Sequence, residues 1–163
     1  MALDPAVAGW FLLFALPICL WAAWTDLSSM LIKNEAVLAL LAVFVVIGFL
    51  TLPLPVFGQQ LLHLVIVLIV TFLLTLIGLI GAGDAKFAAA IAPFVAREDI
   101  FNMMLIFSVC AIVGFLSHRL ARSIGPIRRL APNWKSWGEK ETFPMGYPLG
   151  FSLIIYLLFA FFD

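Results

Sequence analysis

Long uncharged runs alternate with short polar segments along this chain. A helix that crosses a bilayer must span about 30 Å of hydrocarbon, which takes about 20 apolar residues at about 1.5 Å of rise each. The uncharged run at 36–83 is far too long for one crossing, and the stretches Pro-Leu-Pro at 53–55 and Gly-Gln-Gln at 58–60 predict where it breaks. The pattern predicts membrane-spanning helices at 5–25, 36–52, 60–80, 87–96, 100–117 and 145–162.

The segment at 87–96 is ambiguous, because it is short enough to be a re-entrant piece that turns back within the bilayer. Cytoplasmic loops of membrane proteins carry an excess of Lys and Arg. If this segment crosses, eight of the nine basic residues share one side and only Arg97 lies opposite. We therefore predict an all-α, polytopic membrane protein of six transmembrane helices with a short fourth span, both termini outside and three cytoplasmic loops. Those loops hold Lys33, Lys86, Arg119, Arg122, Arg128, Arg129, Lys135 and Lys140.

Composition agrees with this class: 65% of the 163 residues are hydrophobic and 11% are charged, whereas a soluble domain has roughly 25% charged residues. We expect one transmembrane domain over 1–163, with a cytoplasmic basic loop at 118–142 inside it. The formal net charge is zero, which gives no case for nucleic acid as a partner. Cys19 and Cys110 sit in apolar runs without metal-ligand spacing, so we expect no metal. The first span lacks a basic leader region and is interpreted as a retained helix.

Two acidic residues stand at the cytoplasmic ends of separate predicted spans. Asp26 begins a polar loop at 26–35 that follows the first span, and Asp84 follows the third. Two carboxylates in close contact cannot both ionise easily, so such a pair shares a proton. In aspartic hydrolysis the ionised member takes a proton from water, while the protonated member polarises the scissile carbonyl. The remaining acids fit less well, being on the outer side, in the basic loop or at a helix start: Asp4, Glu98, Asp99, Asp163, Glu139, Glu141 and Glu35.

Glycines precede the second acid in the stretch GAGDAK at 81–86. Glycine has no Cβ, so Gly81 and Gly83 permit the close approach of a substrate strand. The alternative is that these glycines merely end the third span while Asp84 caps the fourth. The GxGD motif by itself is too short to decide between the two interpretations.

Asp26 and the Gly-Ala-Gly-Asp motif at 81–84, in a small six-span chain, resemble the type IV prepilin peptidase family of GxGD-type intramembrane aspartic proteases. Ile32 and Asn34 are similar to the D-x5-I-P-N loop of that family. Lys86 is similar to the lysine of its GxGD-x-K motif. The resemblance covers essentially the whole chain, and the motifs together are far more specific than any one of them.

Near the carboxyl end, Phe-Pro-Met-Gly at 143–146 resembles the P-x-G start of the family's last helix. Lys33 stands where the family usually has proline, so we expect a less rigid loop after Asp26. The amino-terminal cytoplasmic domain of the bifunctional members, with its paired CxxC zinc motifs and N-methyltransferase activity, is not found in this sequence. The chain thus resembles the short, peptidase-only form of Flp/Tad-type pilus systems. This implies cleavage without methylation, and neither metal nor cofactor.

The resemblance implies an endopeptidase that removes the short basic leader of prepilin and pseudopilin precursors at the cytoplasmic face of the bacterial inner membrane. Asp26 and Asp84 are then the catalytic pair. The partner is a precursor protein whose own hydrophobic helix stays among the membrane lipids. Gly81 and Gly83 shape the loop, and further substrate-binding candidates are Lys86, Asn34, Pro144 and Gly146.

Other classes of function stay open. A small transporter or ion-relay subunit would place its acids near the bilayer midplane, often in related halves. Here the acids stand at span ends on one side, and no repeat is visible. A non-catalytic pilus-assembly membrane protein would keep the fold without the chemistry. A relative of presenilin or signal peptide peptidase would carry a Tyr-Asp motif, whereas Thr25 precedes Asp26. The sequence predicts neither the oligomeric state nor which pilin is the substrate.

Overall fold

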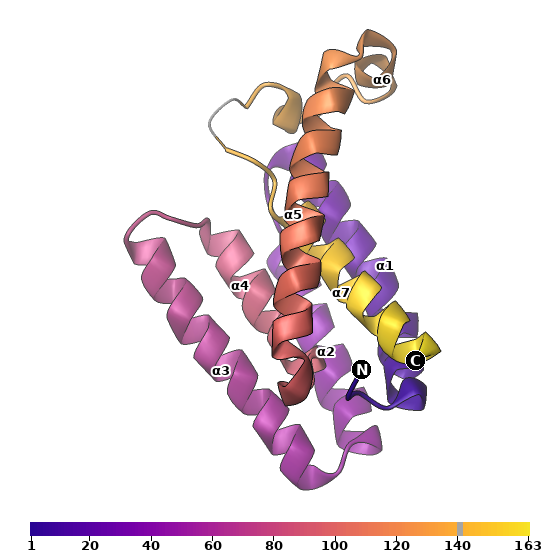
Figure 1. Cartoon of the computed structure of the whole chain (residues 1–163). Helices are drawn as coiled ribbons and strands as arrows, with labels where there is room; N and C mark the ends of the chain where they lie inside the picture. The colour runs from indigo at the N-terminus through magenta and orange to yellow at the C-terminus, as the bar shows by residue number, and fades with distance from the viewer. Residues whose placement is uncertain (140–141) are drawn as a thin grey trace.

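The computed structural model describes residues 1–139 and 142–163, which form helices joined by loops with no strand among them. The long helices are α1 (Pro5–Ser29), α2 (Asn34–Thr51), α3 (Leu54–Leu76), α5 (Ile100–Ser123) and α7 (Gly146–Phe162). Shorter ones are α4 (Ala82–Ile91) and α6 (Gly125–Leu130), with 3₁₀ turns η1 (Ala92–Phe94), η2 (Arg97–Asp99) and η3 (Lys135–Trp137). The all-α prediction is confirmed (Figure 1).

Within those ranges, four helical stretches are long and apolar enough to cross a membrane. They are Pro5–Ser29, Asn34–Thr51, Leu54–Leu76 and Arg97–Ser123. These stretches agree with the predicted first, second, third and fifth spans, and they indicate a multi-pass membrane protein. Helix α4 has 10 residues and α7 has 17, so both are shorter than the four. The count of six spans therefore stays a prediction.

Helices α1, α2, α3, α4, α5 and α7 run in alternating directions, and the short α4 lies beside α3 and runs antiparallel to it (Figure 1). Both termini lie at one end, where the Met1 ammonium pairs with the Asp163 carboxylate. The α1–α2 connection and the starts of α4 and α7 lie toward the other end (Figure 1). The segments that carry Asp26 and Asp84 therefore share one end of the bundle.

The best-packed part of the bundle lies around α1, α2, α4 and α7. Phe11, Phe44 and Phe94 are fully buried, with ring centroids 4.9 Å apart for Phe11 and Phe94. Helices α1 and α7 pack closely because Gly150 lacks a side chain: a Cβ there would lie 3.0 Å from the Cys19 carbonyl oxygen. Most of the apolar side chains of α3 are instead exposed, as suits a helix surrounded by lipid tails.

Two helix boundaries differ from the predicted spans, and one of them changes the setting of Asp26. Helix α3 begins at Leu54 rather than near residue 60. Its first turn accommodates Pro55, where the missing N–H costs no hydrogen bond, so the predicted break is shorter than expected. Helix α1 continues to Ser29, which places Asp26 in its last turn and corrects the prediction that Asp26 begins a loop.

The predicted basic loop at 118–142 is also partly helical. Helix α5 continues to Ser123, and α6 follows at Gly125–Leu130. Helix α5 continues through Arg119 and Arg122, beyond its apolar part. The uncharged stretch of the sequence therefore ends before the helix does. Lys140 and Glu141, which belong to the same predicted loop, lie outside the described residues.

Candidate active site

Asp26 occupies the last turn of α1, and only 5% of its surface is exposed. Its carboxylate Oδ2 accepts a hydrogen bond of 2.6 Å from the backbone N–H of Gly146, the first residue of α7. The first amides of a helix have no partner within the helix, so a carboxylate placed there satisfies one of them. The contact joins the end of α1 to the start of α7 and gives the buried Asp26 a defined partner.

Gly146 meets a steric requirement at this contact. A Cβ added to Gly146 would lie 2.9 Å from Asp26 Oδ2 and 2.7 Å from Ile32 Cδ1. Real Cβ atoms do not approach neighbours this closely, because repulsion rises steeply inside van der Waals contact. The absence of a side chain at this position is therefore what allows α7 to begin directly against Asp26.

Asp84 lies in the first turn of α4 and is half-buried. Its side chain turns back toward Gly81, the residue that caps this helix: a Cβ on Gly81 would lie 2.8 Å from Asp84 Oδ2. A carboxylate in a first helical turn is favoured by the helix dipole. The N-cap of α4 is Gly81 rather than Asp84, no side-chain hydrogen bond caps the helix, and α3 ends at Leu76, before both glycines. The Asp84 carboxylate lies at the same end of the bundle as Asp26.

Asp26 in the last turn of α1 and Asp84 in the first turn of α4 lie at the same end of the bundle. Ile32 lies next to the positions that a Cβ on Gly146 of α7 and a Cβ on Gly83 of α4 would occupy. A Cβ on Gly83 would lie 3.6 Å from Ile32 Cβ, an ordinary van der Waals distance. Helix α4 packs against both α2 and α7, so the helix that carries Asp84 lies beside the helix whose first residue contacts Asp26.

Lys86 and Asn34 form a second link between the motifs. Lys86 Nζ donates a hydrogen bond of 3.3 Å to Asn34 Oδ1, from α4 to the first residue of α2. Pro144 is fully buried just before α7. Lys33, which replaces the family's proline, lies over the Trp21 ring at 5.8 Å, so it stabilises the connection by a cation–π contact.

An aromatic ladder near this end was not predicted from the sequence. Trp134 contacts Trp24 of α1 edge to face at 5.2 Å and stacks on Trp137 at 5.3 Å. Trp137 in turn stacks on His118 of α5 at 5.1 Å. The ladder holds the segment that leads into α7 against α1 and α5. The only sequence signal for it is the concentration of tryptophans in two otherwise unrelated segments.

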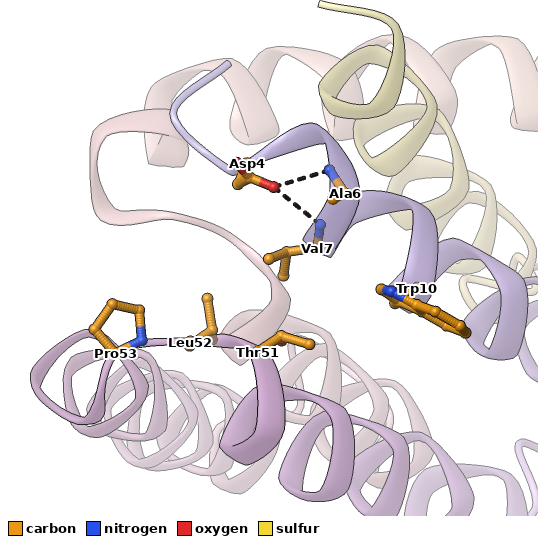
Figure 2. Close-up of a pocket in the computed structure, with 7 residues that line it drawn as sticks. All are labelled: Asp4, Ala6, Val7, Trp10, Thr51, Leu52 and Pro53. Carbon is orange, nitrogen blue, oxygen red and sulfur yellow. Dashed lines mark hydrogen bonds between the residues drawn. The ribbon is translucent and has the colours of Figure 1, made fainter.

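The pocket drawn in Figure 2 lies between the start of α1 and the end of α2, away from Asp26 and Asp84. Its volume is about 550 Å³. The carboxylate of Asp4, which lines the pocket, accepts hydrogen bonds from the backbone N–H groups of Ala6 at 2.9 Å and Val7 at 3.3 Å (Figure 2). These hydrogen bonds cap α1. Because that carboxylate is committed to the helix, we do not assign hydrolytic chemistry to this pocket. In the part of the chain described, no cluster of three or more His, Cys, Asp or Glu could hold a metal ion.

Comparison with known proteins gives a match to one family. The model of the type IV leader peptidase family matches residues 13–116, a range that includes Asp26 and Asp84 but not Gly146. Neither the curated proteins nor the solved structures give a match. The matched range is more than half of the 163 residues. The chain therefore belongs to the type IV leader peptidase family.

Proposed function

We propose that this protein is an intramembrane aspartic endopeptidase that removes the short basic leader from prepilin or pseudopilin precursors. The observation that carries the proposal is that Asp26 in the last turn of α1 and Asp84 in the first turn of α4 lie at one end of the bundle, with Ile32 beside Gly146 and Gly83. Membership of a leader peptidase family adds a protein substrate.

In the proposed topology the chain crosses the bacterial inner membrane six times. Helix α4 with η1 makes the short fourth crossing, and α7 makes the last. The alternating helix directions and the shared end of the two termini support an even number of crossings (Figure 1). Lys33 and Lys86 lie at the end that carries the acids, and Arg97 lies at the other, which favours a cytoplasmic site.

The proposed reaction uses one proton shared between the two carboxyl groups. The ionised group takes a proton from water, whose oxygen attacks the scissile carbonyl carbon, while the protonated group donates a hydrogen bond to the carbonyl oxygen. The tetrahedral intermediate then collapses, the C–N bond breaks, and the leaving amine takes up a proton from the pair. The Gly146 N–H hydrogen bond orients the Asp26 carboxyl group, and the two acids can exchange the roles of base and proton donor within the pair.

The glycines before Asp84 fit the same proposal. Gly81 is exposed and Gly83 is half-buried, and neither has a side chain of its own that would keep substrate backbone away. A transporter would hold its acids near the bilayer midplane, whereas Asp26 and Asp84 lie at helix ends. Co-expression with a precursor distinguishes the third possibility, a non-catalytic assembly protein, from a peptidase.

Co-expression with a pilin precursor from the same genome tests the proposal. Asp26→Asn and Asp84→Asn keep the size of each side chain but remove its charge, so either should leave the precursor uncleaved on an immunoblot. Asp4→Asn is the matched control: asparagine still caps α1 at the other end of the bundle, so cleavage should continue. Cleavage at the wild-type rate by either site variant would contradict the mechanism. An uncleaved precursor with the wild-type chain would favour a non-catalytic protein.

A further inference from the structure

Ile32 is the inward-facing residue of the short connection between α1 and α2. Only 6% of its surface is exposed, whereas its neighbours Leu31 and Lys33 are exposed to the outside. It packs into the main apolar core of the bundle. An apolar side chain with no chemistry of its own therefore lies at the centre of the proposed site.

The Ile32 side chain fits between two glycine backbones. Toward α7, a Cβ on Gly146 would lie 2.7 Å from Ile32 Cδ1 and 2.9 Å from its Cγ1, which is a severe overlap. Toward α4, a Cβ on Gly83 would lie 3.6 Å from Ile32 Cβ, which is ordinary van der Waals contact. Ile32 thus fills the room that the missing side chain at Gly146 leaves, and it faces Gly83 across a space that a methyl group would fill.

Each of these glycines is tied to one of the two acids. The Gly146 N–H donates to Asp26 Oδ2 at 2.6 Å, and Gly83 directly precedes Asp84 in the first turn of α4. A displacement of Ile32 would therefore change the positions of both carboxylates through these glycines.

The connection that carries Ile32 is itself held at both ends. Met30 adopts a left-handed conformation with φ +56°, and its N–H donates to the Asp26 carbonyl at 2.8 Å. At the other end, Asn34 accepts the Lys86 hydrogen bond from α4. A short segment fixed at two points has little freedom to drift.

We propose that Ile32 is a positioning residue that sets the separation of the Asp26 and Asp84 carboxylates. The inference rests on the proposed function, because only a shared reaction makes that separation matter. Isoleucine suits the task, since its branched Cβ restricts χ1 and a close-packed side chain holds its neighbours at fixed distances. Because Gly146 has no side chain, the Ile32 side chain has room beside it, and the sizes of the residues at positions 32 and 146 are complementary.

Truncation at position 32 tests the proposal on purified protein and its pilin precursor. Ile32→Ala should lower kcat about 100-fold, because a misplacement of about 1 Å can cost that much. KM should stay nearly constant, since the contacts with substrate are unchanged. Ile32→Val keeps the branched Cβ and should retain most of kcat. Ile154→Ala is the matched control, a buried truncation further along α7 that should leave kcat close to wild type.

A suppressor experiment isolates the fit between the two positions. Gly146→Ala should abolish most of the activity, because its methyl group overlaps Ile32 Cδ1 and Asp26 Oδ2. Adding Ile32→Val removes Cδ1, the nearest of these atoms, and should raise kcat at least about twofold above the Gly146→Ala single variant. Gly58→Ala is the control, since a Cβ at Gly58 meets nothing within 4 Å.

The outcomes separate the proposed positioning role from ordinary packing. The proposal is overturned if Ile32→Ala keeps the wild-type kcat while its unfolding temperature falls as far as that of Ile154→Ala. It is also overturned if Ile32→Val fails to raise the activity of the Gly146→Ala protein, a comparison that stands even where Ile32→Ala does not fold. A wild-type chain that does not cleave the precursor would overturn the proposed function itself, and the inference with it.

Discussion

The backbone N–H of Gly146 donates a 2.6 Å hydrogen bond to Asp26 Oδ2, across 120 residues of sequence. The bond places a carboxylate at the positive end of the α7 dipole, where negative charge is favoured. It also means that the matched family range, 13–116, holds both acids but not the group that orients one of them. The last helix is therefore part of the proposed site as well as of the bundle.

Gly81→Ala should lower precursor cleavage without unfolding the protein. Its added Cβ would lie 2.8 Å from Asp84 Oδ2, the end of a side chain that can rotate away, so the carboxylate should move rather than the helix. The initial rate of leader release, measured beside the unfolding temperature, checks this. Gly58→Ala serves as the control, and equal rates for the two alanine variants would contradict the role given to Gly81.

Removing the Lys86–Asn34 hydrogen bond should weaken cleavage but not abolish it. The bond is exposed and 3.3 Å long, so its net contribution is modest, and we expect each of Lys86→Met and Asn34→Ala to slow cleavage about fivefold. The double variant should be little worse than either single one, because the same contact is lost in both. Effects that multiply would show that the two residues act separately.

Tyr156→Phe should destabilise the protein at the end away from the acids. The Tyr156 hydroxyl donates to Asp99 Oδ2 at 3.0 Å and accepts the Ala96 N–H at 3.1 Å, and all three residues are buried. Loss of this hydroxyl leaves the buried Ala96 N–H unsatisfied and should cost roughly 1–3 kcal/mol of unfolding free energy. Asp99 Oδ2 keeps its hydrogen bond of 2.7 Å from the Ala2 N–H. Unfolding in detergent measures this.

Tyr147→Phe is the comparison for that prediction. Its hydroxyl makes a single 3.5 Å contact with Ser117 in a half-buried place, so the stability loss should be smaller. Equal losses in the two phenylalanine variants would contradict the importance of the Ala96 contact.

The rate of cleavage should pass through a maximum as pH is varied. At low pH both carboxyl groups of the pair are protonated, and no base remains to activate water. At high pH both are ionised, and no proton remains to polarise the carbonyl. A profile of kcat/KM against pH that rises to a plateau without falling would argue against a shared proton.

The long helices were largely predictable, because an uncharged run of bilayer length has few other structures available to it. Their ends were not. Asp26 marks the end of an apolar window but not of α1, which continues to Ser29 beyond the expected membrane edge. Pro55 suggested a break, yet proline in a first turn leaves α3 intact from Leu54 onward.

The two acids of the proposed site, Asp26 and Asp84, could be predicted because charged residues are rare in this apolar chain. The contacts that position them could not be predicted. Asp26 and Asp84 stand out because ionisable groups at a membrane edge are costly. The fit of Ile32 against Gly146 depends on the packing of α7 beside α1, which local periodicity does not encode. Ile32 was visible as part of a motif, but nothing in the sequence indicated what it touches.

The most direct test of the central claim is leader release by the purified protein, followed by mass spectrometry of the cleaved precursor. We predict that the wild-type chain releases the leader, and that Asp26→Asn and Asp84→Asn release none while unfolding at the wild-type temperature. Release of the leader by either variant at the wild-type rate would contradict the two-carboxylate mechanism.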